Sequence, residues 1–246
     1  RKAQMPKATS AFRTTLSRRR ARTTFNLAPE NVSDTLLKEH LGQIRAAKEL
    51  IYLETQYFRD RRIVAALAAA GKRNADLRVI ALLPAAPEDL QARGLRRVLK
   101  SFGDRFLAVS PVQPRRPDKR DAPSERATLA GAPIIYVHSK VSIFDAKAAI
   151  VSSANLNGRS MKWDAEAGLV ISDHGQVQAL TTKVFSHWLG ERINCPTATT
   201  FDHWKERAVS NASLPPKERK GFIVPYAMGP NRRAGKALPG APEEMV

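Results

Sequence analysis

Five polar residues stand at short intervals among apolar neighbours in the middle of the chain: His138, Lys140, Asp145, Ser153 and Asn155. An imidazole can attack phosphorus or carry a proton near neutral pH, and an ammonium group places positive charge beside phosphate oxygens. Hydroxyl and amide groups can donate hydrogen bonds to the same oxygens. These residue types at this spacing favour a site for a phosphate-bearing substrate.

Predicted strands position these residues. The β-branched and aromatic run 134–137 predicts a strand that delivers His138. Residues two apart on a strand share a face, so His138 and Lys140 are expected to project together. The apolar run 148–151 predicts a second strand, which ends in a turn of hydroxyl and amide groups. Glu166, on the next predicted strand, is expected to accept from the other ring nitrogen of His138 and fix its tautomer.

The full pattern resembles a known motif. Residues 138–155 contain His-x-Lys, four further residues, Asp, six further residues and Ser-Ser-x-Asn. This pattern resembles the HKD motif of the phospholipase D superfamily. We call residues 138–155 the HKD motif. The position before its second Ser is commonly Gly in that family and is Ser152 here. A second segment, IYLETQYF at residues 51–58, is similar to IYIENQYF, which precedes the second of two HKD motifs in phospholipase D enzymes, and differs at Leu53 and Thr55.

The resemblance implies a ping-pong reaction through a phosphohistidine, with no metal and no other cofactor. His138 would protonate the departing headgroup oxygen and later activate water. Lys140 and Asn155 would bind the non-bridging phosphate oxygens, with Ser153 assisting. Glu166 would orient His138 and stabilise its imidazolium form.

Three further residues complete the candidate site. The resemblance counts Asp145 with the catalytic residues, although its place after an apolar run favours securing the loops of the motif itself. Glu54 and Gln56 lie in the segment that lines the active site of the family, so they are candidate substrate-binding residues. The alternative for this segment is a buried strand whose polar groups bind backbone.

The chemistry of the family needs two HKD motifs that face each other, and the full pattern occurs once in this chain. The chain is therefore expected to supply one of two half-sites. It would be the C-terminal half of a two-motif phospholipase D, which the segment 51–58 favours, or it would pair with a second copy of itself. Because the sequence begins at Arg1, we expect a fragment or a processed product.

Three classes of function follow. The first is hydrolysis of a phospholipid such as phosphatidylcholine to phosphatidic acid, with transfer to other alcohols. The second is a homodimeric single-motif nuclease or phosphodiesterase. The third is a half that only binds anionic ligands, against which the intact His138, Lys140, Asn155 and Glu166 argue. In the family, synthesis of phosphatidylserine or cardiolipin usually accompanies a membrane anchor, which is not seen in these residues, so this reaction is less expected.

The charge of the chain indicates its partners. Lys and Arg number 41 against 23 Asp and Glu, which gives a net charge of +18. Such a surface attracts phospholipid membranes or nucleic acid. No apolar run approaches the roughly 20 residues that span a bilayer, so peripheral membrane contact is expected. The lone Cys195 excludes an intramolecular disulfide and leaves a cytoplasmic or a secreted location undecided.

Alternating strand and helix patterns predict an α/β fold, and the resemblance sharpens it to an α/β/α sandwich with a mixed sheet and helices on both faces. We expect residues 1–29 to be a linker or an incomplete N-terminal segment. Residues 30–194 are expected to form the catalytic domain, and residues 195–246 a tail that wraps the sheet edge.

Overall fold

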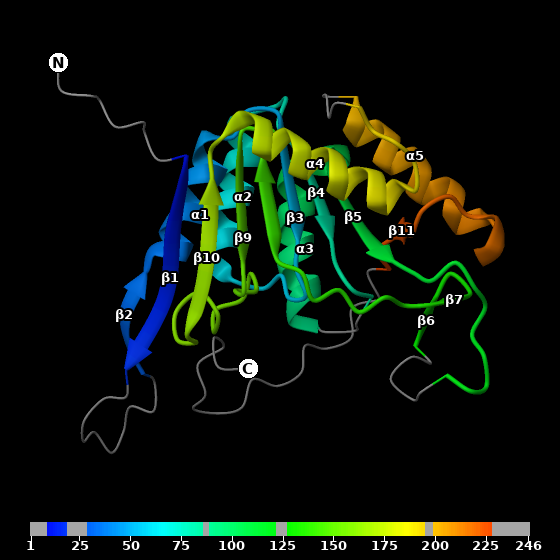
Figure 1. The fold of residues 1–246 in the computed structure, drawn as a ribbon, viewed down its shortest axis with the longest axis horizontal. Coiled ribbons are helices and arrows are strands. Elements are labelled where there is room, and N and C mark those ends of the chain that lie inside the picture. The colour runs from blue at the N-terminus through cyan, green and yellow to red at the C-terminus, as the bar shows by residue number, and fades with distance from the viewer. Residues whose placement is uncertain (1–8, 19–28, 86–88, 122–126, 195–198, 228–246) are drawn as a thin grey trace.

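The fold is built on one large mixed β-sheet (Figure 1). In this computed structural model, the described residues are 9–18, 29–85, 89–121, 127–194 and 199–227. Within them the sheet has nine strands in the order β11-β5-β4-β3-β8-β9-β10-β1-β2. The pairs β3–β4 and β4–β5 are parallel, and every other pair in the sheet is antiparallel.

The elements are short and regular. The strands of the large sheet are β1 Ser10–Arg18, β2 Glu30–Asp34, β3 Leu50–Glu54, β4 Arg78–Leu82, β5 Phe106–Pro111, β8 Val141–Phe144, β9 Ala148–Ser152, β10 Glu166–Ile171 and β11 Ile223–Pro225. A separate hairpin is formed by β6 Thr128–Leu129 and β7 Ala132–Pro133. The helices are α1 Thr35–Ala46, α2 Arg61–Arg73, α3 Asp89–Phe102, α4 His174–Leu189 and α5 Thr200–Ser213, with short 3₁₀ turns at Gly103–Arg105 and Pro216–Glu218.

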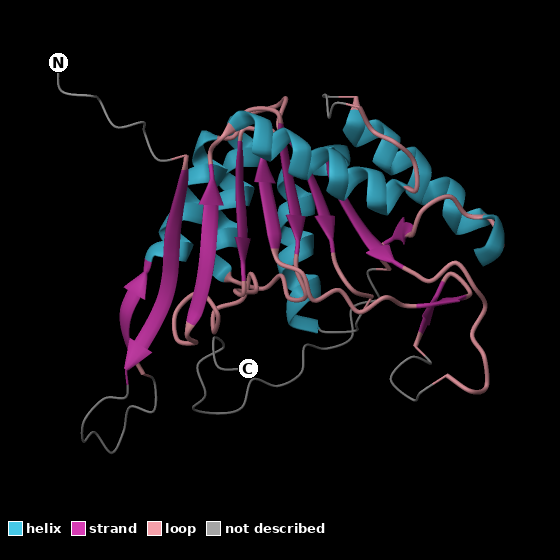
Figure 2. Cartoon of the chain, viewed as in Figure 1, coloured by secondary structure: helices cyan, strands magenta, loops and turns pink. Residues whose placement is uncertain are grey.

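Helices cover both faces of the sheet (Figure 2). Alternate residues of β3 point to opposite faces, so Leu53 packs in the core under α1, α2 and α3, whereas Tyr52 packs under α4 and α5. Two of these helices begin at a capping side chain, which sets the residue where the helix starts. The carboxylate of Asp60 accepts hydrogen bonds from two backbone N–H groups of α2, and that of Asp173 accepts one from α4. The predicted α/β/α sandwich is confirmed.

Two expectations, about the start of the chain and the motif strand, need correction, and the C-terminal tail contains more structure than expected. Residues 10–18 are not a linker, because they form β1 and pair antiparallel with β10. The run 134–137 is not a strand: it makes one isolated bridge at Ile134, and regular structure resumes only at β8. The tail does add a strand, β11, beside β5, but it also contains helix α5, which the sequence did not lead us to expect.

A buried histidine on α1 makes the stability of this fold depend on pH. His40 lies under the sheet, with Nδ1 2.8 Å from the Leu36 carbonyl oxygen and Nε2 3.3 Å from the Ser142 hydroxyl of β8. Burial lowers the pKa of His40, which keeps its ring neutral in the folded state. The unfolded chain takes up a proton below about pH 6.5, so this stabilisation is complete above that pH and is lost progressively as the pH falls.

We expect the free energy of unfolding to fall by about 1.4 kcal/mol for each pH unit between 6.5 and the folded pKa because of His40 alone. Urea denaturation at pH 7.5, 6.5 and 5.5 measures this slope, and His40→Gln should flatten it. The control is His174→Gln, at an exposed position on α4, which should keep the wild-type slope. An unchanged slope in His40→Gln would contradict the prediction.

Candidate active site

The sheet brings most of the segments that carry predicted site residues to one end of its central strands, the lower end in Figure 1, which we call the site edge. The register pairs Glu54 at the end of β3 with Val141 at the start of β8, and Val141 with Val151 near the end of β9. Gly168 near the start of β10 pairs with Ser152. The segments just before β8 and just after β9 therefore meet beside the end of β3 and the start of β10.

His138 and Lys140 lie in the irregular segment that leads into β8, and their surroundings differ. The His138 side chain is exposed, whereas Lys140 is only 7% exposed. The ammonium of Lys140 donates to the His138 carbonyl oxygen, and the Lys140 carbonyl accepts from Ser152 N at 3.1 Å. Burial lowers the pKa of Lys140, and the nearby negative charge of Glu166 acts in the opposite direction. The expectation that both side chains share a strand face does not hold, because the segment is not a strand.

Ser153 and Glu166 contact each other directly. The Ser153 hydroxyl donates to Oε2 of Glu166, and the same hydroxyl accepts from Ala167 N at 3.1 Å. Glu166 thus lies at the site edge, with its charge beside Lys140 and its carboxylate bonded to Ser153. Among the described residues, the Glu166 carboxylate accepts its hydrogen bond from Ser153. The predicted contact of Glu166 with the His138 ring therefore stays a prediction.

Asn155 is held from the end of β3. Its Oδ1 lies 3.4 Å from the Thr55 hydroxyl, which also lies 3.1 Å from the Tyr57 carbonyl oxygen. The next residue, Leu156, donates its backbone N–H to the same hydroxyl at 3.3 Å, and its carbonyl accepts from Arg59 N at 2.8 Å. With Oδ1 directed at Thr55, the amide nitrogen of Asn155 is the group that can donate to a phosphate.

Glu54 and Gln56 differ in what they can do. Glu54 is 5% exposed, and its carboxylate accepts from the Tyr52 hydroxyl at 2.7 Å, from Trp188 Nε1 at 3.0 Å and from the Ser139 hydroxyl. All three donors belong to this chain, and contact of Glu54 with substrate stays a prediction. Gln56 is half-buried just past the end of β3, and its contact with substrate stays a prediction.

Asp145 lies at the far end of β8 from Lys140. Its carboxylate accepts from the backbone N–H groups of Lys48, Glu49 and Leu50 at 2.8, 2.8 and 2.9 Å. It thereby joins the turn after β8 to the start of β3. Asp145 also adopts a left-handed conformation, with φ 52°, which Asp tolerates better than most residues. The carboxylate is thus directed away from the site edge, and this geometry fits the securing role.

The sequence did not lead us to two residues that hold the site. Ser139 stands between His138 and Lys140 and bonds to Glu54, which lies 85 positions away in the chain. Thr55 was visible only as a departure from the family segment, and its contact with Asn155 is again between distant positions, 100 residues apart. No local pattern signals either contact, because each one depends on the pairing of β3 with β8 and on the course of the turn after β9.

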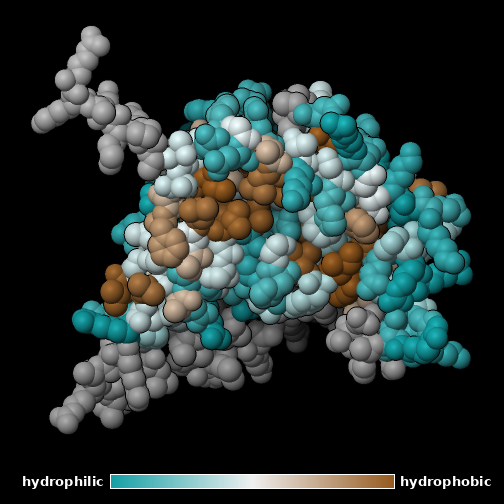
Figure 3. All heavy atoms as spheres, in the orientation of Figure 1, coloured by the Kyte–Doolittle hydropathy of each residue, from teal (hydrophilic) through white to brown (hydrophobic). Residues whose placement is uncertain are grey.

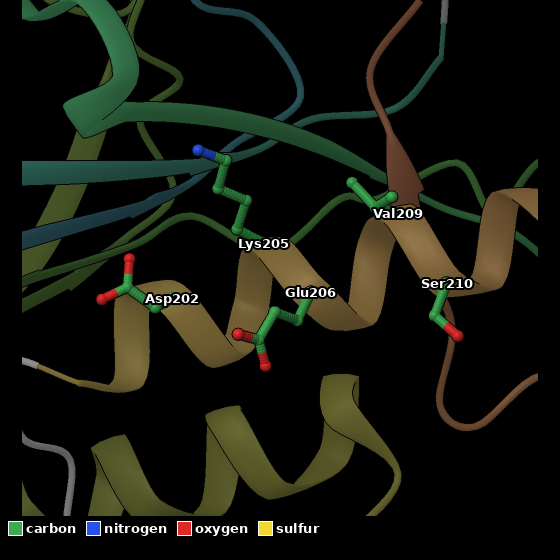
Figure 4. Close-up of a pocket in the computed structure, with 5 residues that line it drawn as sticks. All are labelled: Asp202, Lys205, Glu206, Val209 and Ser210. Carbon is green, nitrogen blue, oxygen red and sulfur yellow. The ribbon is translucent and has the colours of Figure 1, made fainter.

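Other features of the described residues lie away from this edge. A shallow hollow of about 550 Å³ on α5 is lined by Asp202, Lys205, Glu206, Val209 and Ser210 (Figure 4). His203 and Lys205 also stand two positions apart, but they lie on this helix, and His203 pairs with Glu191 at 2.5 Å. Within the described ranges no cluster of three or more His, Cys, Asp or Glu side chains has the arrangement of a metal site. Helices in the same ranges are too short or too polar to cross a bilayer.

The chain is similar to several known proteins. Residues 41–188 match the family model described as cardiolipin synthase, PLD-like domain. The chain is 28% identical over 180 residues to phospholipase D B of Dictyostelium discoideum, and 29% over 176 residues to phospholipase D2 of Bos taurus. These matches cover 61% and 58% of this chain but only 15% and 19% of the relatives, so the chain spans less than a fifth of their length.

Among solved structures, a phospholipase D family member from Salmonella typhimurium, Nuc, is similar over 73% of this chain and 93% of its own. The sequence identity is 15% and the TM-score 0.47.

Proposed function

The chain belongs to the phospholipase D-like family, and from that premise we propose that it supplies one half-site of a phosphodiesterase that hydrolyses phospholipid headgroups. The observation that carries the proposal is the meeting of His138, Lys140 and Asn155 at one sheet edge, with Glu166 beside Lys140. This edge combines a proton carrier, a buried cation and an amide donor, which are the groups that a phosphodiester needs.

The proposed reaction has two steps. The histidine of the other half-site attacks phosphorus, and the bond from phosphorus to the headgroup oxygen breaks while His138 gives that oxygen its proton. His138 then takes a proton from water, which attacks the phosphohistidine and releases phosphatidic acid. An alcohol in place of water would give transphosphatidylation. Lys140 and Asn155 stabilise the charge on the non-bridging oxygens throughout.

An exposed apolar part of one sheet face, beside the site, supports the proposal that this chain pairs with a second HKD half. Phe12 of β1, Leu169 of β10 and Val151 of β9 are neighbours in register on one face, and they are 67%, 42% and 38% exposed. We call these three residues the apolar row. On β1 the usual burial of apolar side chains and exposure of polar ones is reversed, since Phe12 is exposed whereas Thr15 is fully buried. Figure 3 shows hydrophobic side chains gathered on this face, over β10 and β9.

We expect a second HKD half, and not solvent, to cover the apolar row. Exposed apolar side chains that adjoin one another can mark a site of protein contact. The row ends at Val151, two positions before Ser153, so a protein docked on it would lie against the site edge. Helix α4 covers part of the same face near β9. A related half, turned by a two-fold axis, could lay its own equivalent helix over the row and bring its HKD motif opposite this one.

We expect Phe12→Asp to abolish self-association of the isolated chain. The substitution places a charge at one end of the apolar row and leaves the monomer fold intact, because Phe12 is exposed there. Sedimentation velocity across a range of concentrations measures the effect. Lys72→Asp, at an exposed position on α2 and on the opposite face of the sheet, is the control that should not change the mass. A dimer that persists in Phe12→Asp with wild-type affinity would refute this contact.

A second function is favoured by one observation, the net charge of +18. Such a charge suits nucleic acid as well as anionic lipid, so a homodimeric nuclease with a single HKD motif is the alternative. Cleavage of single-stranded DNA that falls steeply with salt would favour it.

The direct test is the formation of phosphatidylethanol from phosphatidylcholine vesicles in dilute ethanol, with the solution mass determined in parallel. Product formed by an assembled pair of chains would support the lipid reaction. If the folded chain gives no product alone or after addition of a chain that carries the other HKD motif, and cleaves DNA instead, the nuclease takes its place.

A further inference from the structure

We propose that Glu54 and Thr55, the last residue of β3 and the residue after it, are positioning residues that hold the two separate segments of the HKD motif in place. Glu54 would hold the segment 138–140, and Thr55 would hold the segment 153–156. This inference rests on the proposed function, and it gives the segment 51–58 a role that contact with substrate does not explain.

Glu54 acts through Ser139. The Ser139 hydroxyl is bonded to Oε1 of Glu54, while Oε2 accepts from Tyr52 and Trp188. A buried carboxylate costs much less free energy when it is fully hydrogen-bonded, so these donors fix it from both sides. Trp188 belongs to α4 and Tyr52 to β3. Glu54 therefore ties the residue between His138 and Lys140 to two rigid elements.

The segment 138–140 needs such an anchor. It has no regular secondary structure, and the strand pairing that orders the chain begins only at Val141. Charge-assisted hydrogen bonds are about twice as strong as neutral ones, so the bond from Ser139 to Glu54 is a strong restraint for a short irregular segment. Catalytic groups must be held within roughly 0.5 Å of the productive geometry, which an unrestrained loop does not provide.

Thr55 acts on the other segment through one hydroxyl. Its oxygen accepts from Leu156 N at 3.3 Å, and its hydrogen is directed between the Tyr57 carbonyl at 3.1 Å and Asn155 Oδ1 at 3.4 Å. Thr55 is fully buried, and its own backbone N–H donates to the Leu82 carbonyl of β4 at 3.3 Å. The hydroxyl thus fixes both the turn after β9 and the orientation of the Asn155 amide.

The first test removes the Ser139 hydroxyl and compares two leaving groups. In an assembled pair of chains, Ser139→Ala misplaces His138, so hydrolysis of phosphatidylcholine, whose leaving alcohol needs a proton, should fall about 30-fold. A phosphatidyl ester of p-nitrophenol needs little proton donation to its leaving group, so the first-turnover release of p-nitrophenol, which precedes the attack of water, should slow no more than about threefold. Ser139→Thr, which keeps the hydroxyl, should restore both rates.

The matched control is Ser142→Ala, three positions away, which deletes a buried hydroxyl that bonds to His40 and not to the site. It should change both rates by the same factor. If Ser139→Ala also lowers both rates equally, Ser139 and Glu54 serve general stability, and the proposal fails for this segment.

The second test isolates Thr55 and needs no activity. Hydrogen exchange of the peptide 153–158 should speed up about tenfold in Thr55→Val, which keeps the shape and loses the hydroxyl, and stay at the wild-type rate in Thr55→Ser. Exchange of the peptide 136–142 should likewise speed up in Ser139→Ala and not in Ser142→Ala. Thr181→Val, in the middle of α4, is the control for loss of a buried threonine hydroxyl.

These readouts separate the two proposals. If the wild-type protein lacks phosphodiesterase activity while exchange responds as described, the proposed function fails and the positioning contacts stand. If activity is present and exchange in both peptides is unchanged in Thr55→Val and Ser139→Ala, the positioning roles are refuted.

Discussion

Replacing His138 with Ala is expected to lower kcat for phosphatidylcholine hydrolysis by at least about a thousandfold in the assembled enzyme. The imidazole is the group at the site edge that can give a proton to the leaving oxygen and take one from water near neutral pH. Because the His138 side chain is exposed, its removal should leave the melting temperature unchanged. Vesicle hydrolysis and thermal denaturation of the same samples measure both quantities.

His174→Ala is the control for this prediction. His174 is exposed at the first position of α4 and lies away from the site edge, so its replacement should keep full activity. Turnover that survives in His138→Ala, at a rate near that of the wild type, would refute the proposed chemistry altogether. Lost turnover with a lower melting temperature would instead indicate that the imidazole stabilises the fold.

Replacing Asp145 with Ala should destabilise the fold without touching the chemistry. Three backbone N–H groups, those of Lys48, Glu49 and Leu50, lose their acceptor, and Ala must take over a left-handed conformation. We expect a loss of about 3 kcal/mol in the free energy of unfolding, or about 6–12 °C in melting temperature. At a temperature where the variant is folded, kcat should stay near the wild-type value.

Two variants calibrate this result. Asp145→Asn keeps one acceptor oxygen and tolerates the left-handed conformation, so it should lose about half as much stability. Asp173→Ala removes the acceptor of a single N–H at the start of α4 and should cost about 1 kcal/mol. If Asp145→Ala is instead stable and inactive, Asp145 belongs to the catalytic machinery after all.

The sequence predicted the parts of the site that are close in the chain. The HKD motif is local, and the strand β9 inside it is visible as the apolar run 148–151. The strand predicted to carry Glu166 is also present, as β10. These elements bury one face or both, and burial dictates residue type.

The parts that escaped prediction depend on distant partners. β1 carries Phe12 and Leu16 on its exposed side, and it is a strand because β10 supplies its hydrogen bonds. The run 134–137 has strong strand propensity, yet most of it finds no strand partner and stays irregular. The link from Glu54 to Ser139 was equally invisible, because sequence patterns do not show which buried carboxylate meets which hydroxyl.

The pairing of β3 with β8 has a consequence for folding kinetics. It joins strands β3, β4 and β5, which are linked by βαβ units, to strands β8, β9 and β10, which are linked by antiparallel connections. Each group of three strands can form through contacts between chain neighbours, but the pairing of β3 with β8 closes a large loop, since Ser139 and Glu54 are 85 positions apart. A chain that stalls before this closure would possess most of its helices and strands and no active site. The onset of catalysis therefore marks completion of the fold more strictly than any measure of secondary structure.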